Sequence, residues 1–315
     1  MLLLYLFIII VLLICIYIYI TNNIKQSLIL YVYKESENSR KNLEYFVNHG
    51  ILKNNNYTYV ILINDYICTV DIPDQNNIIV LKKKNEYDIQ SYQYAFNTLY
   101  KSMHKYDYFF FINSSCIGPF TPTYNKDWIE IITNMFINNV RLIGPIIEVP
   151  NDNYGLAAYN NEVAQKVNKG PNIPFIHTYM FAVDKVGLNV LTAYPEIFNP
   201  TKYKKDLVYK TERLISSAML LNGYNIRSLL LKYKNVNWLN KNYWDYYMWN
   251  TNNKYSDPEI PNNYDGLNVN PLEVMFIKNI RDVNETRLKS QSGIDPETKK
   301  YLKLYNKWED EASQR

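Results

Sequence analysis

The chain has few of the residues on which the commonest catalytic sites depend. It contains three histidines and three cysteines in 315 residues, so a histidine-rich metal site has little material. Cys68 and Cys116 could form one disulfide, which is not a disulfide framework. No Gly-x-Gly-x-x-Gly turn, Walker loop, Gly-x-Ser-x-Gly elbow or Cys-x-x-Cys pair occurs. Carboxylates, amides and the backbone are therefore the groups left for chemistry.

An excess of charge is also missing. The 34 basic and 30 acidic residues leave a formal net charge of +4 at pH 7. No basic stripe and no recognisable nucleic-acid-binding motif occurs in the sequence, and proteins that bind nucleic acid usually show one or both. We therefore expect no nucleic-acid partner.

The first charged residue is Lys25, and residues 2–20 are uncharged and predominantly apolar. Nineteen residues at about 1.5 Å each give a helix of roughly 28 Å, close to the ~30 Å hydrocarbon core of a bilayer. A cleaved signal peptide is the alternative, but it normally has a basic start and small residues at its cleavage site. Neither feature occurs here, so the sequence predicts a retained membrane anchor over residues 1–24.

After this segment, short apolar runs alternate with stretches of helical spacing. Strands are predicted by seven runs, at residues 28–33, 59–63, 78–81, 108–112, 141–144, 180–183 and 226–231. Helices are predicted at residues 39–49, 89–103, from 127 onward and at 208–222. This alternation predicts an α/β fold with a mainly parallel, Rossmann-like sheet flanked by helices. We expect this domain to cover residues 25–285, followed by a polar helical tail at 286–315.

Polar residues follow several of the predicted strands directly. In an open α/β sheet, ligands bind beyond the carboxyl ends of the strands, so we expect these residues to converge on one cleft. The candidates at strand ends and at one helix start are Asn85, Asp88, Asn113, Ser114, Ser115, Asp184 and Glu212.

Several short motifs follow one another in a fixed order. They are Asn85-x-x-Asp88, Asn113-Ser-Ser-x-x-Gly-Pro-Phe120, Phe181-Ala-Val-Asp-Lys-Val-Gly-Leu188, Glu212 with Ser216, Gly223-Tyr-Asn and Asn270-Pro-Leu-Glu-Val-Met-Phe-Ile-Lys278. The series resembles a family of glycosyltransferases from algae, protists and large DNA viruses, distantly similar to the rhamnan-synthesis protein F group. The resemblance covers roughly residues 28–281. It implies a GT-A-type fold that uses a nucleotide sugar and a glycan or glycoprotein acceptor.

The same resemblance implies roles for individual residues. Glu212 stands where an acceptor-side base is found, and Asp184 is a second catalytic candidate. The residues implied to bind the nucleotide sugar are Asn85, Asp88, Asn113, Ser114, Ser115, His177 and Lys278. Secretory-pathway glycosyltransferases share a type II anchor, so the resemblance implies the ER or Golgi, or a virion or virus-factory membrane for a viral chain.

The sequence departs from the GT-A pattern at one position. Asn113, Ser114 and Ser115 occupy the strand end where GT-A enzymes usually carry the Asp-x-Asp metal ligands. Amides and hydroxyls are weak ligands for Mg²⁺ or Mn²⁺ compared with carboxylates. We therefore assign no metal ligand. Two alternatives stay open: Mn²⁺ or Mg²⁺ bound with the nucleotide sugar, or neutralisation of phosphate by Lys82, Lys83 or Lys278.

Each candidate also has a structural interpretation. Asp88 and Asp184 could cap helices, Asn113-Ser-Ser could form a turn, and Glu212 could be a solvated surface acid. The missing Asp-x-Asp pair also leaves open a non-catalytic descendant that binds a glycan or a partner. The positions of these side chains in the structure decide between the structural and the functional interpretations.

Overall fold

A computed structural model describes most of the region between residues 25 and 278. The described residues are 25–84, 87–122, 125–149, 173–198, 211–240, 242–247, 257–260 and 268–278, with the single residues Tyr5, Ile9, Val11 and Tyr264. The predicted anchor lies outside these ranges apart from three single residues, and Asn85 and the tail at 286–315 lie wholly outside them. Among the described residues, no helix combines the length and apolar character needed to cross a bilayer. The anchor therefore stays a prediction.

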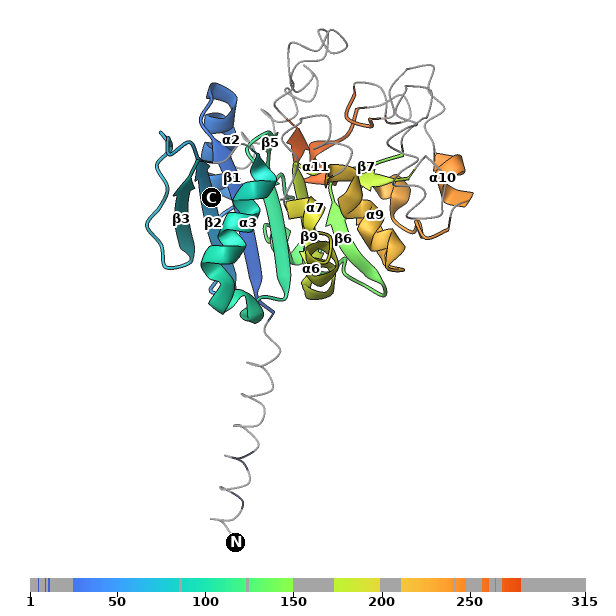
Figure 1. The fold of residues 1–315 in the computed structure, drawn as a ribbon, viewed down its shortest axis with the longest axis horizontal. Coiled ribbons are helices and arrows are strands. Elements are labelled where there is room, and N and C mark those ends of the chain that lie inside the picture. The colour runs from blue at the N-terminus through green and yellow to red at the C-terminus, as the bar shows by residue number, and fades with distance from the viewer. Residues whose placement is uncertain are drawn as a thin grey trace.

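A seven-stranded sheet forms the centre of the molecule (Figure 1), in the order β10–β6–β9–β4–β1–β2–β3. The strands are β1 (Ser27–Lys34), β2 (Tyr57–Asn64), β3 (Ile78–Lys83), β4 (Tyr108–Asn113), β6 (Val140–Gly144), β9 (Met180–Asp184) and β10 (Asn225–Ser228). Four of the six neighbouring pairs are parallel, which confirms the predicted mainly parallel sheet. Strand β9 runs antiparallel to both of its neighbours, β4 and β6.

Helices cover both faces of this sheet. The main ones are α2 (Glu37–His49), α3 (Asp88–Leu99), α4 (Trp128–Thr133), α6 (Lys185–Thr192), α7 (Pro195–Phe198) and α9 (Arg213–Leu221). Successive side chains of a strand point to opposite faces, and β4 shows the result. Phe110 packs edge-on against Trp128 of α4, while Phe111 packs against Tyr92 of α3. Phe110 and Phe111 are fully buried, as expected for a central strand covered on both faces.

Two small ribbons lie beyond the carboxyl ends of the central strands. One pairs β7 (Ile147–Glu148) with β8 (Phe175–Ile176), and the other pairs β5 (Cys116–Ile117) with β11 (Ile277–Lys278). Gly118 follows β5 with φ +151°, and a Cβ there would collide with the carbonyl oxygen of Met275. Glycine at this position therefore lets the segment before β11 approach closely, and Lys278 of β11 then pairs with Cys116 of β5.

Cys68 and Cys116 are both free thiols, so the disulfide that the sequence allowed does not form. Cys116 is buried, and burial raises the pKa of its thiol well above the ordinary value. The cysteines therefore act as ordinary packing residues in this fold.

Candidate functional site

Asp88 and Asn113 meet at the carboxyl end of β4. Asp88 is the first residue of α3, and the side-chain amide of Asn113 donates a hydrogen bond to its carboxylate. Asn113 in turn accepts hydrogen bonds on Oδ1 from the backbone N–H of Ser115, at 3.0 Å, and from the Ser115 hydroxyl. The N-cap of α3 is Tyr87 and not Asp88, so the capping interpretation of Asp88 is wrong. The turn therefore fixes the amide, and the amide orients the carboxylate.

The segment Asn113-Ser-Ser is a hydrogen-bonded turn. The backbone N–H of Ser114 donates to Val32 at 2.9 Å, and its carbonyl accepts from the side chain of Asn42 at 2.9 Å. The Ser114 hydroxyl accepts from the backbone of Lys34 at 3.5 Å. The oxygens that would have to replace an Asp-x-Asp pair are thus neutral and already hydrogen-bonded. This strand end does not fit a divalent cation.

Glu212 lies directly before α9 and is partly buried, so its interpretation as a solvated surface acid is wrong. Its carboxylate accepts a hydrogen bond from the Thr178 side chain. Burial raises the pKa of Glu212, against the opposing positive charge of Lys278. Burial and the charge of Glu212 together raise the pKa of Asp88 to about 6, again against Lys278. Two carboxylates of raised pKa therefore share one lysine.

His177 lies between carboxylates that come from separate segments. Its Nδ1 is 3.2 Å from Oε2 of Glu259, and its Nε2 is 3.2 Å from Oε2 of Glu148. Burial lowers the pKa of His177. The charge of Asp257 and the hydrogen bonds to Glu148 and Glu259 outweigh this effect and raise the pKa to about 10. We call His177, Glu148, Asp257 and Glu259 the histidine cage.

Glu259 joins the histidine cage to the lysine. Its Oε1 accepts hydrogen bonds from the Tyr179 hydroxyl at 3.1 Å and from the backbone N–H of Lys278 at 3.0 Å. The Tyr179 carbonyl accepts from the backbone of Asn113 at 2.9 Å. Hydrogen bonds through Glu259 and Tyr179 therefore connect the histidine cage to Lys278 and to Asn113, so these residues form one polar cluster.

Asp184 lies at the opposite edge of the sheet, so its predicted place in the site is wrong. Because β9 is antiparallel, Asp184 pairs with Tyr108 at the start of β4. Its carboxylate accepts from the backbone of Gly187 at 2.8 Å and lies 3.2 Å from Arg141. It is the N-cap of α6, as the structural interpretation proposed. The same reversal of β9 brings His177 and Thr178 to the site instead.

The prediction missed the acidic members of the histidine cage. Glu148 follows β6 at the carboxyl edge, so reading the end of that strand would have found it. Asp257 and Glu259 lie in a segment with no strand or helix periodicity, which gives no such signal. Lys82 and Lys83 are exposed, and Lys83 lies 4.5 Å from the ring of Tyr94. Lys278 is the lysine whose charge reaches both Asp88 and Glu212.

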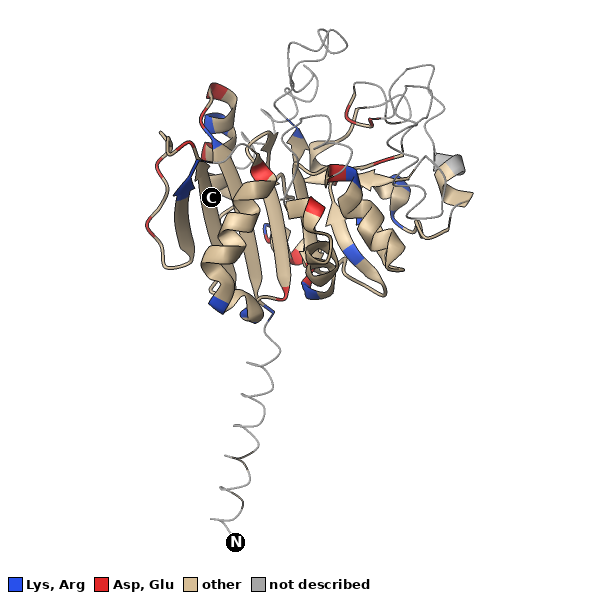
Figure 2. Cartoon of the chain, in the orientation of Figure 1, with Lys and Arg blue, Asp and Glu red and all other residues tan. Residues whose placement is uncertain are grey.

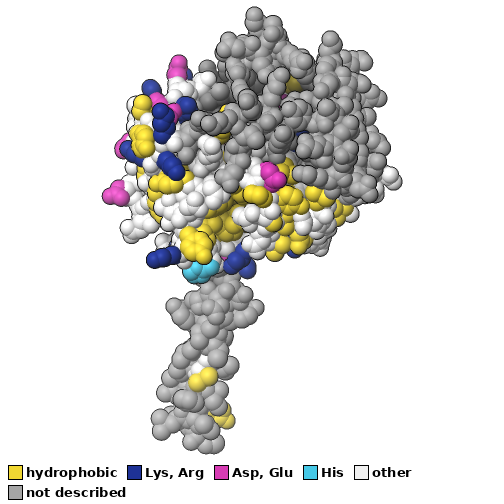
Figure 3. All heavy atoms as spheres, in the orientation of Figure 1, with side chains coloured by type: hydrophobic (Ala, Val, Ile, Leu, Met, Phe, Trp, Pro, Cys, Tyr) yellow, Lys and Arg dark blue, Asp and Glu magenta, His cyan; other side chains and the backbone are white. Residues whose placement is uncertain are grey.

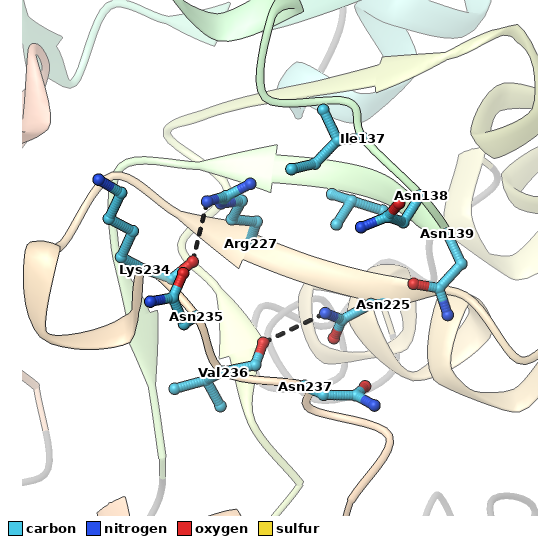
Figure 4. Close-up of a pocket in the computed structure, with 10 residues that line it drawn as sticks. Ile137, Asn138, Asn139, Asn225, Arg227, Lys234, Asn235, Val236 and Asn237 are labelled. Atoms are coloured by element: carbon cyan, nitrogen blue, oxygen red, sulfur yellow. Dashed lines mark hydrogen bonds between the residues drawn. The ribbon is translucent and has the colours of Figure 1, made fainter.

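A pocket of about 280 Å³ lies elsewhere, at the start of β6 and β10 (Figure 4). Asparagines dominate its lining, and Arg227 donates to the carbonyl of Lys234 at 2.8 Å across it. Asn225 is buried and donates to the carbonyl of Val236 at 3.2 Å. None of the described residues that line this pocket is a carboxylate or a histidine, in contrast to the cluster at the carboxyl edge.

Comparisons with known proteins give a distant likeness to a solved structure. No family model and no curated protein matches the chain. Among solved structures, it is similar to the mannosyltransferase PcManGT from Pyrobaculum calidifontis in complex with GDP-Man and Mn²⁺, at 9% identity and a TM-score of 0.38. The match covers 65% of this chain and 54% of that protein, so the chain spans about half of its length. The membership of this chain in a glycosyltransferase family stays a prediction from the motif series.

Proposed function

We propose that the chain is a glycosyltransferase that moves a sugar from a nucleotide-sugar donor to a hydroxyl of a glycan or glycoprotein acceptor. The observation that carries this proposal is the grouping of Glu212, Asp88 and Lys278 beyond the carboxyl end of β4. A base, a second carboxylate and a cation at one sheet edge are the groups that glycosyl transfer needs. The motif series resembles that family independently of this geometry.

In this proposal Glu212 is the general base. Its carboxylate takes the proton of the acceptor hydroxyl while the oxygen bonds to the anomeric carbon of the donor. The bond from that carbon to the diphosphate oxygen breaks, and the nucleoside diphosphate leaves with the bonding electrons. A raised pKa suits a base, because proton transfer is most effective when the pKa lies near the working pH. Lys278 stabilises the departing charge.

Asp88 has a different role in this proposal. Its carboxylate is held by Asn113, so it presents a fixed acceptor for hydroxyls of the sugar or ribose. Residues 2–20 would tether the domain to a membrane from the amino edge of the sheet, where β1 begins. Membrane fractionation with a carbonate wash tests the tether, and protease protection in intact vesicles tests on which side of the membrane the domain lies.

The direct experiment incubates the purified full-length chain in detergent with a panel of nucleotide sugars. We expect release of one nucleoside diphosphate from one donor class, and faster release with a glycan acceptor. Glu212→Gln serves as the inactive variant, and Glu44→Gln is the matched control because Glu44 is exposed on α2. Absence of binding and turnover across the panel would contradict the proposal.

A non-catalytic glycan-binding protein is the second candidate. It is favoured by the neutral, already bonded oxygens of the Asn113-Ser-Ser turn. Calorimetry with glycans and nucleotide sugars distinguishes the two. A binding protein would retain glycan in the Glu212→Gln variant and would turn over no donor in the wild type.

A further inference from the structure

The histidine cage concentrates negative charge where water has little access. The side chains of Glu259, His177 and Glu148 are 3%, 11% and 16% exposed. Among the described residues of the cage, three carboxylates face a single imidazole. Charges removed from water are costly unless opposite charge compensates them. His177 lies between two of these carboxylates, so the cage already places a group that carries positive charge when protonated among acidic oxygens, which are the surroundings a cation requires.

The positions of the ligand atoms fit a metal ion. Nδ1 of His177 and carboxylate oxygens of Asp257 and Glu259 all lie within 4.8 Å of one another. Ligands at about 2.0–2.2 Å from a metal are separated by roughly 3.3–3.6 Å in tetrahedral geometry and by roughly 2.8–3.1 Å between neighbours in octahedral geometry. The 3.2 Å between Nδ1 and Oε2 of Glu259 lies between these two ranges. These two groups therefore need to move by only about a few tenths of an ångström to share an ion.

We propose that the histidine cage binds one first-row transition-metal dication, Mn²⁺ or Zn²⁺, through His177 Nδ1, Asp257 and Glu259. The dication takes the place of a proton on Nδ1 and brings twice its charge to the same carboxylates. Nε2–H then donates to Glu148, 3.2 Å away. A carboxylate on the outer ring nitrogen is the usual way in which a metal-bound histidine is oriented.

The mixed ligand set decides which metals are favoured. Imidazole nitrogen suits transition metals, whereas Mg²⁺ and Ca²⁺ prefer an all-oxygen shell. One nitrogen and two carboxylates leave positions for water or for the oxygens of a ligand, as in catalytic metal sites. We therefore expect Mn²⁺ and Zn²⁺ to bind at least tenfold more tightly than Mg²⁺.

The location of this metal site also bears on the proposed transfer reaction. Glu259 contacts the backbone of Lys278, whose charge reaches Glu212 and Asp88. A dication in the cage would supply, from a different segment, the positive charge that the Asn113-Ser-Ser turn does not hold. This use of the ion rests on the proposed function, whereas the metal site itself rests on the cage alone.

The test measures metal binding without any sugar nucleotide. The full-length chain is stripped with chelator in detergent and titrated with Mn²⁺, and bound ion is followed by electron paramagnetic resonance and metal analysis. We expect one ion per chain, a rise in melting temperature with Mn²⁺, and a comparable result with Zn²⁺. Absence of saturable binding, or equal binding of Mg²⁺, would overturn the proposal.

Variants locate the ion. Asp257→Asn and His177→Gln should weaken Mn²⁺ binding at least tenfold, and Glu148→Gln should weaken it about 10- to 100-fold through loss of the outer hydrogen bond. Glu44→Gln should bind as the wild type does. Asp257→Asn is decisive if His177→Gln fails to fold, because it retains the imidazole. Unchanged binding in Asp257→Asn would refute the assignment.

Metal binding and the proposed function can fail separately. Mn²⁺ binding that Asp257→Asn abolishes, with no nucleotide sugar used, would leave the site standing and refute transfer. Turnover of a nucleotide sugar without metal binding in the cage would refute the metal site and leave the proposed transfer reaction standing.

Discussion

The central sheet has an amino edge, where its parallel strands begin, and a carboxyl edge, where they end. The two edges use the same kinds of residue in different ways. At the amino edge, charges pair singly: Asp184 with Arg141 at 3.2 Å, and Asp107 with Lys25 at 3.6 Å. Basic side chains and a histidine lie on the surface there, where the chain enters the sheet (Figure 3). At the carboxyl edge, acidic groups from distant segments meet around His177. Along the strands between the edges, charged residues are scarce (Figure 2).

The difference shows what separates a structural carboxylate from a candidate catalytic one. Asp184 accepts a backbone N–H and faces an arginine, which is the ordinary arrangement of a helix cap. Burial raises the pKa of all three carboxylates, Asp184, Glu212 and Asp88, but the charge beside each of them differs. Arg141 opposes the rise at Asp184, whereas the negative charge of Glu212 adds to it at Asp88. Perturbed carboxylates that face one another mark functional sites more often than paired ones do. We therefore expect the chemistry at the carboxyl edge, where two carboxylates interact.

The largest expected effect is that of Glu212→Gln. Removing the general base should reduce kcat by about 100- to 10,000-fold, with little change in fold because glutamine keeps the shape and accepts the Thr178 hydrogen bond. The measurement is donor turnover beside circular dichroism, with Glu44→Gln as control. Full activity of the folded variant would remove Glu212 from the mechanism.

Asp88→Asn should separate stability from activity. Its folded-state pKa of about 6 lies above the ordinary 3.8, so its proton contributes stability that is complete below pH 3.8 and is lost as the pH rises through about 6. The wild type should therefore lose up to about 3 kcal/mol from this group over that range, and the variant should not. Denaturant unfolding at pH 4 and pH 7 measures the difference.

The same variant should lose activity at pH 7 while its stability rises relative to the wild type. Asparagine removes the negative charge beside Glu212 and keeps one acceptor oxygen. An equal pH dependence of stability in wild type and Asp88→Asn would show that Asp88 is not the perturbed group.

Alanine substitutions at Gly118 and Gly223 test how much a close backbone contact contributes to stability at one edge of the sheet and not at the other. A Cβ at Gly118 would collide with Met275 and Phe276, whereas a Cβ at Gly223, also at positive φ, would meet nothing within 4 Å. Gly118→Ala and the matched control Gly223→Ala each carry a conformational cost of about 1 kcal/mol, because alanine disfavours positive φ. Gly118→Ala additionally has to displace β11. We expect Gly118→Ala to lose about 2–3 kcal/mol of unfolding free energy and to weaken donor binding through Lys278. Equal effects would show that the close approach at Gly118 is unimportant.

Most of the sheet could be predicted from the sequence, because apolar runs such as residues 28–33 and 108–112 indicate buried strands directly. The direction of β9 could not, since an apolar run reads alike in parallel and antiparallel pairings. That single reversal moves Asp184 to the amino edge and brings His177 to the site. Asp88 and Glu212 were found from strand and helix ends. Glu259 comes from an aperiodic segment, where only three-dimensional packing reveals a partner.

The smallest expected effect belongs to Asp184, and it tests the comparison from the amino edge. Asp184→Ala removes the cap hydrogen bond to Gly187 and the contact with Arg141. It should cost about 1–2 kcal/mol of unfolding free energy. Asp184→Asn keeps an oxygen that can cap the helix and should lose less unfolding free energy. Comparison of the two variants therefore separates the contribution of the cap hydrogen bond from that of the charge. Donor turnover should be unchanged in both. A folded Asp184→Asn variant without activity would show that the amino edge takes part in the chemistry, and the contrast between the two edges would fail.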